Sequence, residues 1–309
     1  MTRFTPTELA AHLKDGLLSF PVTAFNQDLE IDEENYRRHL DWQSSFDVAG
    51  LFAAGGTGEG FSLTPDESAR VVRMAVEEAG DRTPVLASAG GSTRQAVENA
   101  RAAEAAGAEG LLLLPPYLTE CDQAGLTAHV DAVCAATNIA VIVYNRANAI
   151  YSADTVATLA ERHHNFIGFK DATGDIEAVT RVVAKNGDRL FYLGGLPTAE
   201  TFALPMLQLG MSTYSSAMFN FVPEFALEFY ADVRRQDRTA ITEKLNRFVL
   251  PYLEIRDRVK GYGVSIVKGG LTAIGRDAGT VRPPLQNLTP TDITDLTHLI
   301  DSAGIRPTS

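Results

Sequence analysis

Residues 140–171 read AVIVYNRANAIYSADTVATLAERHHNFIGFKD, and this stretch decides the fold. It opens with one continuous apolar run, 140–145, and closes with another, 166–171, on either side of a longer amphipathic segment. Runs that are apolar on both faces are typical of buried parallel strands, and two parallel strands need a crossover between them. The stretch therefore predicts a strand-helix-strand unit of a parallel sheet.

The same alternation extends along the whole chain. Eight candidate strands lie at 17–25, 50–55, 84–90, 110–115, 140–145, 166–171, 190–195 and 211–217. Their starts are roughly 20 to 35 residues apart, the length of one strand plus its crossover helix. Eight such units predict an α/β protein whose strands close into a (β/α)8 TIM barrel.

Further helices are expected at both ends of this barrel. A helix at 6–15, before the first strand, is expected to plug the bottom of the barrel. Helical segments at 222–236, 239–259, 264–276 and 289–303 exceed what the eighth unit needs. We therefore divide the chain into a barrel with its plug helix, 1–221, and a C-terminal helical region packed on the barrel, 222–309.

Composition excludes several classes of function. The 309 residues carry a net charge of -12, which argues against a surface for nucleic acid or anionic membranes. No apolar run reaches the roughly 18 residues that a transmembrane helix needs. The two cysteines, Cys121 and Cys134, match neither a disulfide framework nor a metal-binding spacing. A soluble, unprocessed protein of the reducing cytoplasm is expected.

Lys170 is the first candidate for chemistry, because functional residues of such barrels lie where the strands end. Burial at the end of the run 166–171 would favour the neutral amine, which can attack a carbonyl group and form a Schiff base. A lysine at a strand end can equally be a rim residue whose charged head reaches water. The residues predicted to surround Lys170 distinguish between these two interpretations.

Other strand ends carry polar groups that suit an anionic substrate. The turn 55–60, Gly-Gly-Thr-Gly-Glu-Gly, can point backbone N–H groups at an anion, or it can be a plain glycine turn. Tyr144 and Arg146 can relay protons and clamp a carboxylate, or can be a strand aromatic and a solvated rim charge. Ser215 lies at the eighth strand end. Glu59 and Asp171 are isolated carboxylates, so no metal is expected.

The combination of Gly-Gly-Thr-Gly-Glu at 55–59, Pro116-Tyr117, Tyr144-Asn145 and Gly-Phe-Lys-Asp at 168–171 resembles the dihydrodipicolinate synthase and N-acetylneuraminate lyase superfamily. The resemblance implies an eight-stranded barrel with extra C-terminal helices, assembled as a homotetramer. It also implies that Lys170 forms a Schiff base with a 2-oxo acid, without any bound cofactor. Tyr144 would shuttle protons, and the turn at Gly56 and Thr57 would hold the carboxylate of the 2-oxo acid.

Departures from the synthase branch narrow the substrate. That branch has two hydroxyl residues in the glycine turn, a second tyrosine after Pro-Tyr, and an arginine five residues beyond the strand-five tyrosine. Gly56, Leu118 and Ala149 occupy these positions here, which disfavours synthase activity. Segments 19–23, 53–60 and 144–147 instead look most like a branch that dehydrates and decarboxylates a 2-oxo sugar diacid. Arg146 is then the candidate for the distal carboxylate, and Ser215 a further substrate-binding candidate.

Two alternatives remain open from the sequence. A Schiff-base aldolase would use the same Lys170 and Tyr144 to cleave a 2-keto-3-deoxy sugar acid and release pyruvate. A non-catalytic sugar-acid binding protein would keep the barrel without turnover, but it needs no imine-forming amine. The products formed from one substrate separate the three readings.

Overall fold

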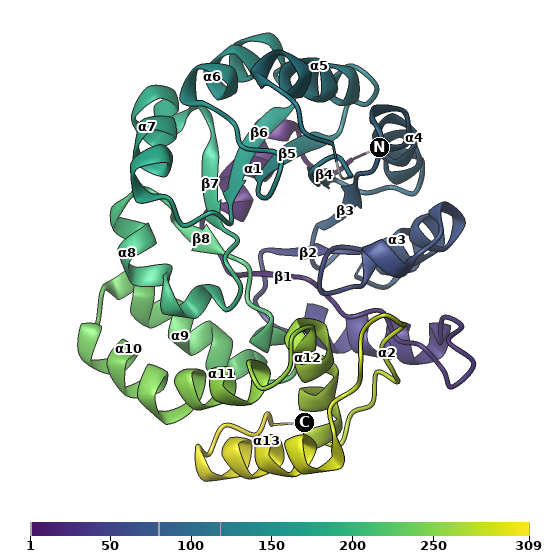
Figure 1. The fold of residues 1–309 in the computed structure, drawn as a ribbon, viewed down its shortest axis with the longest axis vertical. Helices are drawn as coiled ribbons and strands as arrows, with labels where there is room; N and C mark the ends of the chain where they lie inside the picture. The colour runs from purple at the N-terminus through teal and green to yellow at the C-terminus, as the bar shows by residue number, and fades with distance from the viewer. Residues whose placement is uncertain (1, 80, 118, 309) are drawn as a thin grey trace.

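The computed structural model describes residues 2–79, 81–117 and 119–308, where eight strands pair in parallel in chain order. The strands are β1 (Leu18–Ser19), β2 (Gly50–Phe52), β3 (Val85–Ala89), β4 (Gly110–Leu113), β5 (Ala140–Asn145), β6 (Phe166–Asp171), β7 (Phe191–Gly194) and β8 (Thr213–Tyr214). A parallel bridge from Leu18 to Ser215 closes the ring (Figure 1). The predicted (β/α)8 barrel is confirmed.

A helix follows each of the first seven strands and returns the chain along the outside of the barrel (Figure 1). These helices are α2 (Glu33–Ser44), α3 (Pro65–Ala79), α4 (Thr93–Ala105), α5 (Gln123–Cys134), α6 (Ala153–Arg162), α7 (Ile176–Asn186) and α8 (Ala203–Gln208). Their starts follow local capping chemistry. Thr64 and Glu67 cap α3 reciprocally, since each side chain accepts the backbone N–H of the other, at 3.2 and 2.8 Å.

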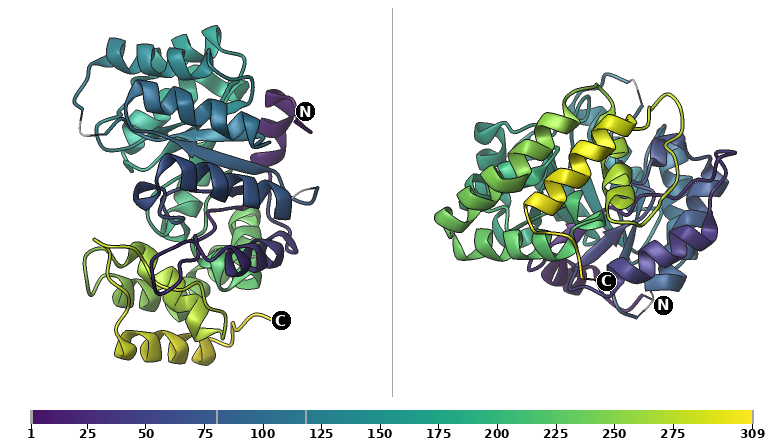
Figure 2. Two further views of the ribbon diagram at one scale, coloured as in Figure 1. Left: turned by 90° about the vertical axis from the view of Figure 1, so that its right-hand side faces the viewer. Right: turned by 90° about the horizontal axis from the view of Figure 1, so that it is seen from below.

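Two hydrophobic clusters hold this architecture together. Alternate side chains of a strand point to opposite faces, so Ile142 and Tyr144 face the barrel interior while Val141 and Val143 face the helices. The inner cluster also contains Leu9 and Leu13 of α1 (Pro6–Leu13). Figures 1 and 2 place α1 across one end of the barrel, as the predicted plug helix requires.

The C-terminal helices gather at one side of the barrel (Figure 2). They are α9 (Pro223–Arg235), α10 (Arg238–Lys244), α11 (Leu250–Arg256), α12 (Tyr262–Ala273) and α13 (Pro290–Ser302). The single helix predicted at 239–259 is interrupted by a π-helical turn, Leu245–Val249, and α11 then begins at Leu250 with Pro251 as its second residue. Proline lacks the N–H that a continuous α-helix would need there. The division of the chain at residue 221 stays a prediction.

The first and last strands are shorter than predicted. Only two residues of the predicted strand 17–25 and two of 211–217 make ladder pairs. The apolar residues beyond them, among them Phe20 and Val22, are buried as loop. No helix among the described residues has the length and apolar character needed to cross a membrane.

Candidate active site

Lys170 points into the barrel, together with Tyr144. The two residues are direct register partners on β5 and β6, and because side chains alternate, both face the interior. Lys170 is 4% exposed. Its Nζ lies 4.0 Å from the ring centroid of Phe20 and 4.8 Å from that of Tyr144, and it donates to Ser215 Oγ at 3.3 Å. Strand pairing thus assembles the predicted Lys170, Tyr144 and Ser215 in one place.

The electrostatic surroundings favour the neutral amine of Lys170. Burial lowers its pKa from 10.5 to about 7, and the positive charge of Arg146 contributes to the same shift. The adjacent carboxylate does not compensate, because Asp171 faces the other side of the strand. There it accepts from Asn145 Nδ2 at 2.7 Å and caps the following turn through Thr173. The shift of the pKa makes the neutral form of the Lys170 amine accessible near neutral pH.

Gly195 makes room for the Lys170 side chain. A Cβ at this position would lie 2.6 Å from Lys170 Cε, closer than any real contact. The carbonyl oxygen of Gly195 also accepts the Tyr144 hydroxyl at 3.1 Å. This role of Gly195 was not predicted from the sequence. A glycine two residues beyond the last inward-facing residue of β7, Leu193, was the available signal.

The Tyr144 hydroxyl is held between two groups. It donates to Gly195 and accepts from Arg146 Nη1 at 3.1 Å. Burial raises the pKa of Tyr144, and the charge and hydrogen bond of Arg146 oppose that shift. Arg146 itself is exposed at the barrel mouth, in a turn closed by reciprocal backbone bonds with Ala149. This arrangement gives the Tyr144 hydroxyl one acceptor and one cationic donor.

The glycine turn after β2 packs against Phe20, and the ring of Phe20 in turn contacts Lys170. A Cβ on Gly55 would collide with the Phe20 ring at 2.3 Å, and the same ring carries Lys170 Nζ on its face. Gly56 is exposed, with open space where a side chain would be, and Thr57 is half-buried. The assignment of Gly56 and Thr57 to a carboxylate stays a prediction.

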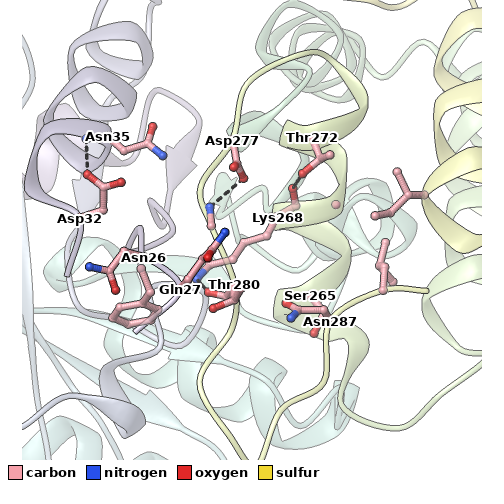
Figure 3. A pocket seen from close by; sticks show the side chains of 15 residues that line it. Asn26, Gln27, Asp32, Asn35, Ser265, Lys268, Thr272, Asp277, Thr280 and Asn287 are labelled. Carbon is pink, nitrogen blue, oxygen red and sulfur yellow. Dashed lines mark hydrogen bonds between the residues drawn. The ribbon is translucent and has the colours of Figure 1, made fainter. Parts of the chain in front are cut away.

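Glu59 closes this turn and is anchored from the far end of the chain. Its backbone has φ 54°, and its side chain is fully buried. One carboxylate oxygen lies 2.7 Å from Lys268 Nζ, and the other accepts the backbone N–H of Arg282 at 2.9 Å. Figure 3 shows Lys268 reaching from α12 towards the Thr280 segment, whose carbonyl it contacts at 2.6 Å. Glu59, an isolated carboxylate in the sequence, is therefore half of a buried ion pair.

The sequence contained one signal for this anchor. Lys268 is a single cation inside the apolar segment 264–274, VSIVKGGLTAI, and is only 3% exposed. A buried lysine needs a partner, and none is available on its own helix. Only the tertiary structure brings Glu59, more than two hundred positions earlier, beside it.

The residues after β8 have different roles. Ser215 faces Lys170, whereas Ser216 points the other way and donates to the buried carboxylate of Glu200. Asn220 is fully buried and bonds the backbone of Phe20 and Val22 as well as His39. Ser216 and Asn220 are therefore structural. Leu118, a position that departs from the synthase branch, lies outside the described residues.

The potential metal ligands do not come together. Among residues 2–79, 81–117 and 119–308, no group of three or more His, Cys, Asp or Glu side chains could hold an ion. Glu59 and Asp171, the two carboxylates weighed in the sequence, are occupied by Lys268 and by Asn145 with Thr173.

An inward-facing lysine at the end of β6 in a closed (β/α)8 barrel defines a class of barrel enzymes that act through an amine. The chain belongs to the dihydrodipicolinate synthetase family, which matches residues 13–303. The crystal structure of dihydrodipicolinate synthase from Bacillus clausii has a TM-score of 0.87 at 26% identity, and covers 95% of this chain and 99% of that one. A pyruvate complex of the Acinetobacter baumannii synthase has a TM-score of 0.83 at 27% identity, over 94% and 99% of the two chains.

Curated relatives are much more similar in sequence. A probable 5-dehydro-4-deoxyglucarate dehydratase from Pseudarthrobacter chlorophenolicus is 75% identical over 300 residues, 97% of this chain and 99% of that protein. Its counterpart from Corynebacterium glutamicum is 67% identical, over 98% of this chain and 96% of that protein. The predicted family and the lyase class are confirmed, and the relatives carry the name of the dehydratase branch that the motifs favoured.

Proposed function

We propose that this protein converts 5-dehydro-4-deoxy-D-glucarate to 2,5-dioxopentanoate, water and carbon dioxide, in the catabolism of sugar acids. One observation carries the proposal: a buried amine without an acidic partner, Lys170, is placed beside the phenol of Tyr144 at the carboxyl end of a barrel. The names of the relatives supply the substrate, and the pyruvate complex of the Acinetobacter structure supports a 2-oxo acid as its reacting part.

The chemistry uses Lys170 as an electron sink. Its neutral amine attacks the C5 carbonyl, and loss of water gives an iminium that acidifies C4. Removal of a C4 proton forms an enamine, which expels the C3 hydroxyl as water and leaves a conjugated iminium. The C1–C2 bond then breaks, carbon dioxide leaves, and its electron pair passes through C2–C3 and C4–C5 to the nitrogen. Protonation and hydrolysis release the dioxo acid and the amine, so atoms and electrons balance without a cofactor.

Each polar group of the site has a proposed role in this sequence. Tyr144 takes the C4 proton and returns one to the leaving hydroxyl, and the Arg146 charge facilitates ionisation of the phenol. The N–H groups at Gly56 and Thr57 hold the carboxylate next to the imine. Arg146, exposed at the mouth, holds the distal carboxylate. Ser215 positions the Lys170 nitrogen.

Borohydride trapping tests the Schiff base. Incubation with substrate and sodium borohydride should add one reduced substrate adduct to the protein, localised to Lys170 by peptide mass spectrometry. Lys170→Ala should abolish the adduct, whereas Lys185→Ala, which removes an exposed lysine on α7, should leave it intact. Full trapping in the Lys170→Ala variant would disprove the mechanism.

A product assay tests the reaction type separately. Carbon dioxide and an aldehyde formed in equal amounts from the proposed substrate support the dehydratase. Pyruvate from the same substrate would instead show an aldolase that uses the same lysine. Tight binding of the substrate without any product would indicate a non-catalytic binding protein.

We also propose a cytoplasmic homotetramer. The family resemblance supports the tetramer, and so do two large side chains exposed on the loops after β2 and β4, Phe61 at 62% and Tyr117 at 76%. Cys121 and Cys134 are both unpaired, in keeping with a reducing compartment. Light scattering of the purified protein should give four times the mass of one chain; a single-chain mass would reject the tetramer.

A further inference from the structure

A cavity of about 550 Å³ lies between α2 and α12, apart from the groups assigned to the substrate. The wall from α2 carries Asn35, Arg38, His39 and Trp42, and segments 271–277 and 306–307 form the rest. It adjoins the polar cavity drawn in Figure 3, with which it shares Asn35 and Asp277. Its volume is within the range of about 300 to 1,000 Å³ that small-molecule sites occupy.

Arg276 is held in this cavity without an acid beside it. Its Cζ lies 4.1 Å from the ring centroid of Trp42, a cation-π contact. Partial burial lowers the pKa of Arg276, and the positive charge of Arg38 lowers it further. Among the described parts of the chain, no carboxylate forms an ion pair with Arg276. The charge of Arg38 thus disfavours the charged form of Arg276, and a negative charge between them would relieve this repulsion.

The residues that line the cavity include more cations than acids. Three arginines and a single aspartate line it: Arg38, Arg276, Arg306 and Asp277. Asp277 is turned towards its own loop, where it accepts the Gly279 N–H at 2.8 Å. Glu34 lies 3.8 Å from Arg38 and is 91% exposed, and Arg306 is paired with Asp301. The surplus is notable in a chain whose net charge is -12.

Trp42 supplies a further unused donor. The residue is 8% exposed, and its indole Nε1 is buried with no hydrogen-bond acceptor among the described residues. This N–H has almost no accessible surface, so it is an unsatisfied group of the cavity wall and not a direct contact for a ligand.

We propose that this cavity binds a small oxyanion, a carboxylate or a phosphate, between the guanidinium of Arg276 and the side chain of Arg38. The planar guanidinium presents parallel N–H donors that match two oxygens of such an ion. Contact with the Trp42 ring restrains the Arg276 guanidinium before the ligand arrives. The site is independent of the reaction proposed at Lys170.

Intrinsic fluorescence provides a direct test, because Trp42 is the single tryptophan of the chain. Inorganic phosphate and succinate are titrated into the Lys170→Ala protein, in which imine formation cannot contribute to the signal. Ionic strength is held constant with chloride. A saturable change with either probe supports the site, and the tighter of the two identifies the phosphate or carboxylate source. The same response to chloride alone, or no saturable response to either probe, would overturn the proposal.

Substitutions of single arginines show which side chains bind the anion. Arg276→Gln is expected to weaken binding about tenfold or more, because a charge-assisted fork is lost. Arg38→Gln removes an exposed side chain and should weaken binding by a smaller factor. Arg101→Gln removes one charge from the exposed face of α4 and should leave the affinity unchanged. Equal affinities in the Arg276→Gln and Arg101→Gln proteins, with unaltered melting curves, would refute the assignment.

Discussion

Two lysines of this protein are buried to nearly the same degree, yet their surroundings differ. Lys170 is 4% exposed and Lys268 is 3% exposed. Each amine lies over a phenylalanine ring, Phe20 at 4.0 Å and Phe25 at 4.4 Å. Burial is the largest influence on both, and it lowers the pKa of each.

The difference between them is one carboxylate. Glu59 lies 2.7 Å from Lys268, and its charge opposes the effect of burial on the Lys268 pKa. Among the described residues, the Lys170 amine hydrogen-bonds only the Ser215 hydroxyl, and the nearby charge of Arg146 lowers its pKa further. Burial alone therefore does not define a nucleophile; burial without an acidic partner does.

The largest contrast should come from removing Lys170. Lys170→Met is expected to lower kcat/KM by about 10⁴-fold or more, as loss of a covalent nucleophile does. The same change should raise stability at pH 7. The pKa of Lys170 falls from 10.5 in the unfolded chain to about 7, so the unfolded state binds more protons between these values. Burial of the Lys170 amine therefore lowers the free energy of unfolding by up to about 4 kcal/mol at pH 7.

Urea unfolding at pH 7 and at pH 10 checks the stability part. The gain in the Lys170→Met protein should shrink as the pH rises towards 10.5, where the unfolded lysine is also neutral. A variant less stable than the parent at pH 7 would contradict the low pKa of Lys170.

The opposite result is expected at Lys268. Lys268→Met leaves the Glu59 carboxylate buried and unpaired, which should destabilise the protein by about 3 to 5 kcal/mol. The double variant Glu59→Gln, Lys268→Met should recover most of that loss, because neither charge remains. Thermal melting of the single and double variants measures both. If Lys268→Met were as stable as the parent, the ion pair would not be the anchor of the glycine turn.

Tyr144 separates proton transfer from imine formation. Tyr144→Phe should lower kcat about 10³-fold, within the usual range for a general acid or base. Borohydride trapping at Lys170 should persist, because the amine is still present. Tyr151→Phe, at another buried tyrosine, is the matched control and should retain activity. Equal losses in the two variants would point to packing instead of proton transfer.

The pH profile reports the Lys170 amine directly. Below the pKa of about 7, kcat/KM should fall about tenfold per pH unit, because only the neutral amine attacks. Arg146→Met removes a cation that lowers the pKa of Lys170, so this acidic limb of the kcat/KM profile should move to higher pH. An unmoved limb would show that Arg146 acts on substrate binding alone.

The smallest effect is expected at Ser215. Ser215→Ala removes one hydrogen bond to Lys170 and should reduce kcat/KM several-fold, about 1 kcal/mol in the barrier. Ser216→Ala is the neighbouring control, whose loss falls on stability because Glu200 loses its donor. If the roles of the two serines were exchanged, Ser215→Ala would lower stability and Ser216→Ala would lower kcat/KM.

Much of the fold was predictable from local patterns. Buried parallel strands such as 140–145 and 166–171 coincide with their predicted bounds, because each is an apolar run that ends in polar residues. At the first and last strands, apolar residues such as Phe20 continue beyond the ladder, and hydrophobicity alone cannot distinguish buried loop from strand. At Pro251 the helical period persists while the backbone hydrogen bonding cannot.

The candidate site was predictable as far as strand ends could indicate it. Lys170, Tyr144, Arg146 and Ser215 could be chosen because strand ends of a barrel converge, and the structure brings them together. Gly195 was missed because its role is the absence of a side chain beside Lys170, which only packing shows.

The sequence by itself determined the barrel, the family and a lysine at the end of the sixth strand, because these depend on periodicity and short motifs. The tertiary structure alone decided which of the two buried lysines has an acidic partner. The pKa of an amine depends on charges within a few ångströms, and Glu59 meets Lys268 while Asp171 turns away from Lys170. Those distances depend on how segments far apart in the sequence pack together, and no local sequence pattern encodes them.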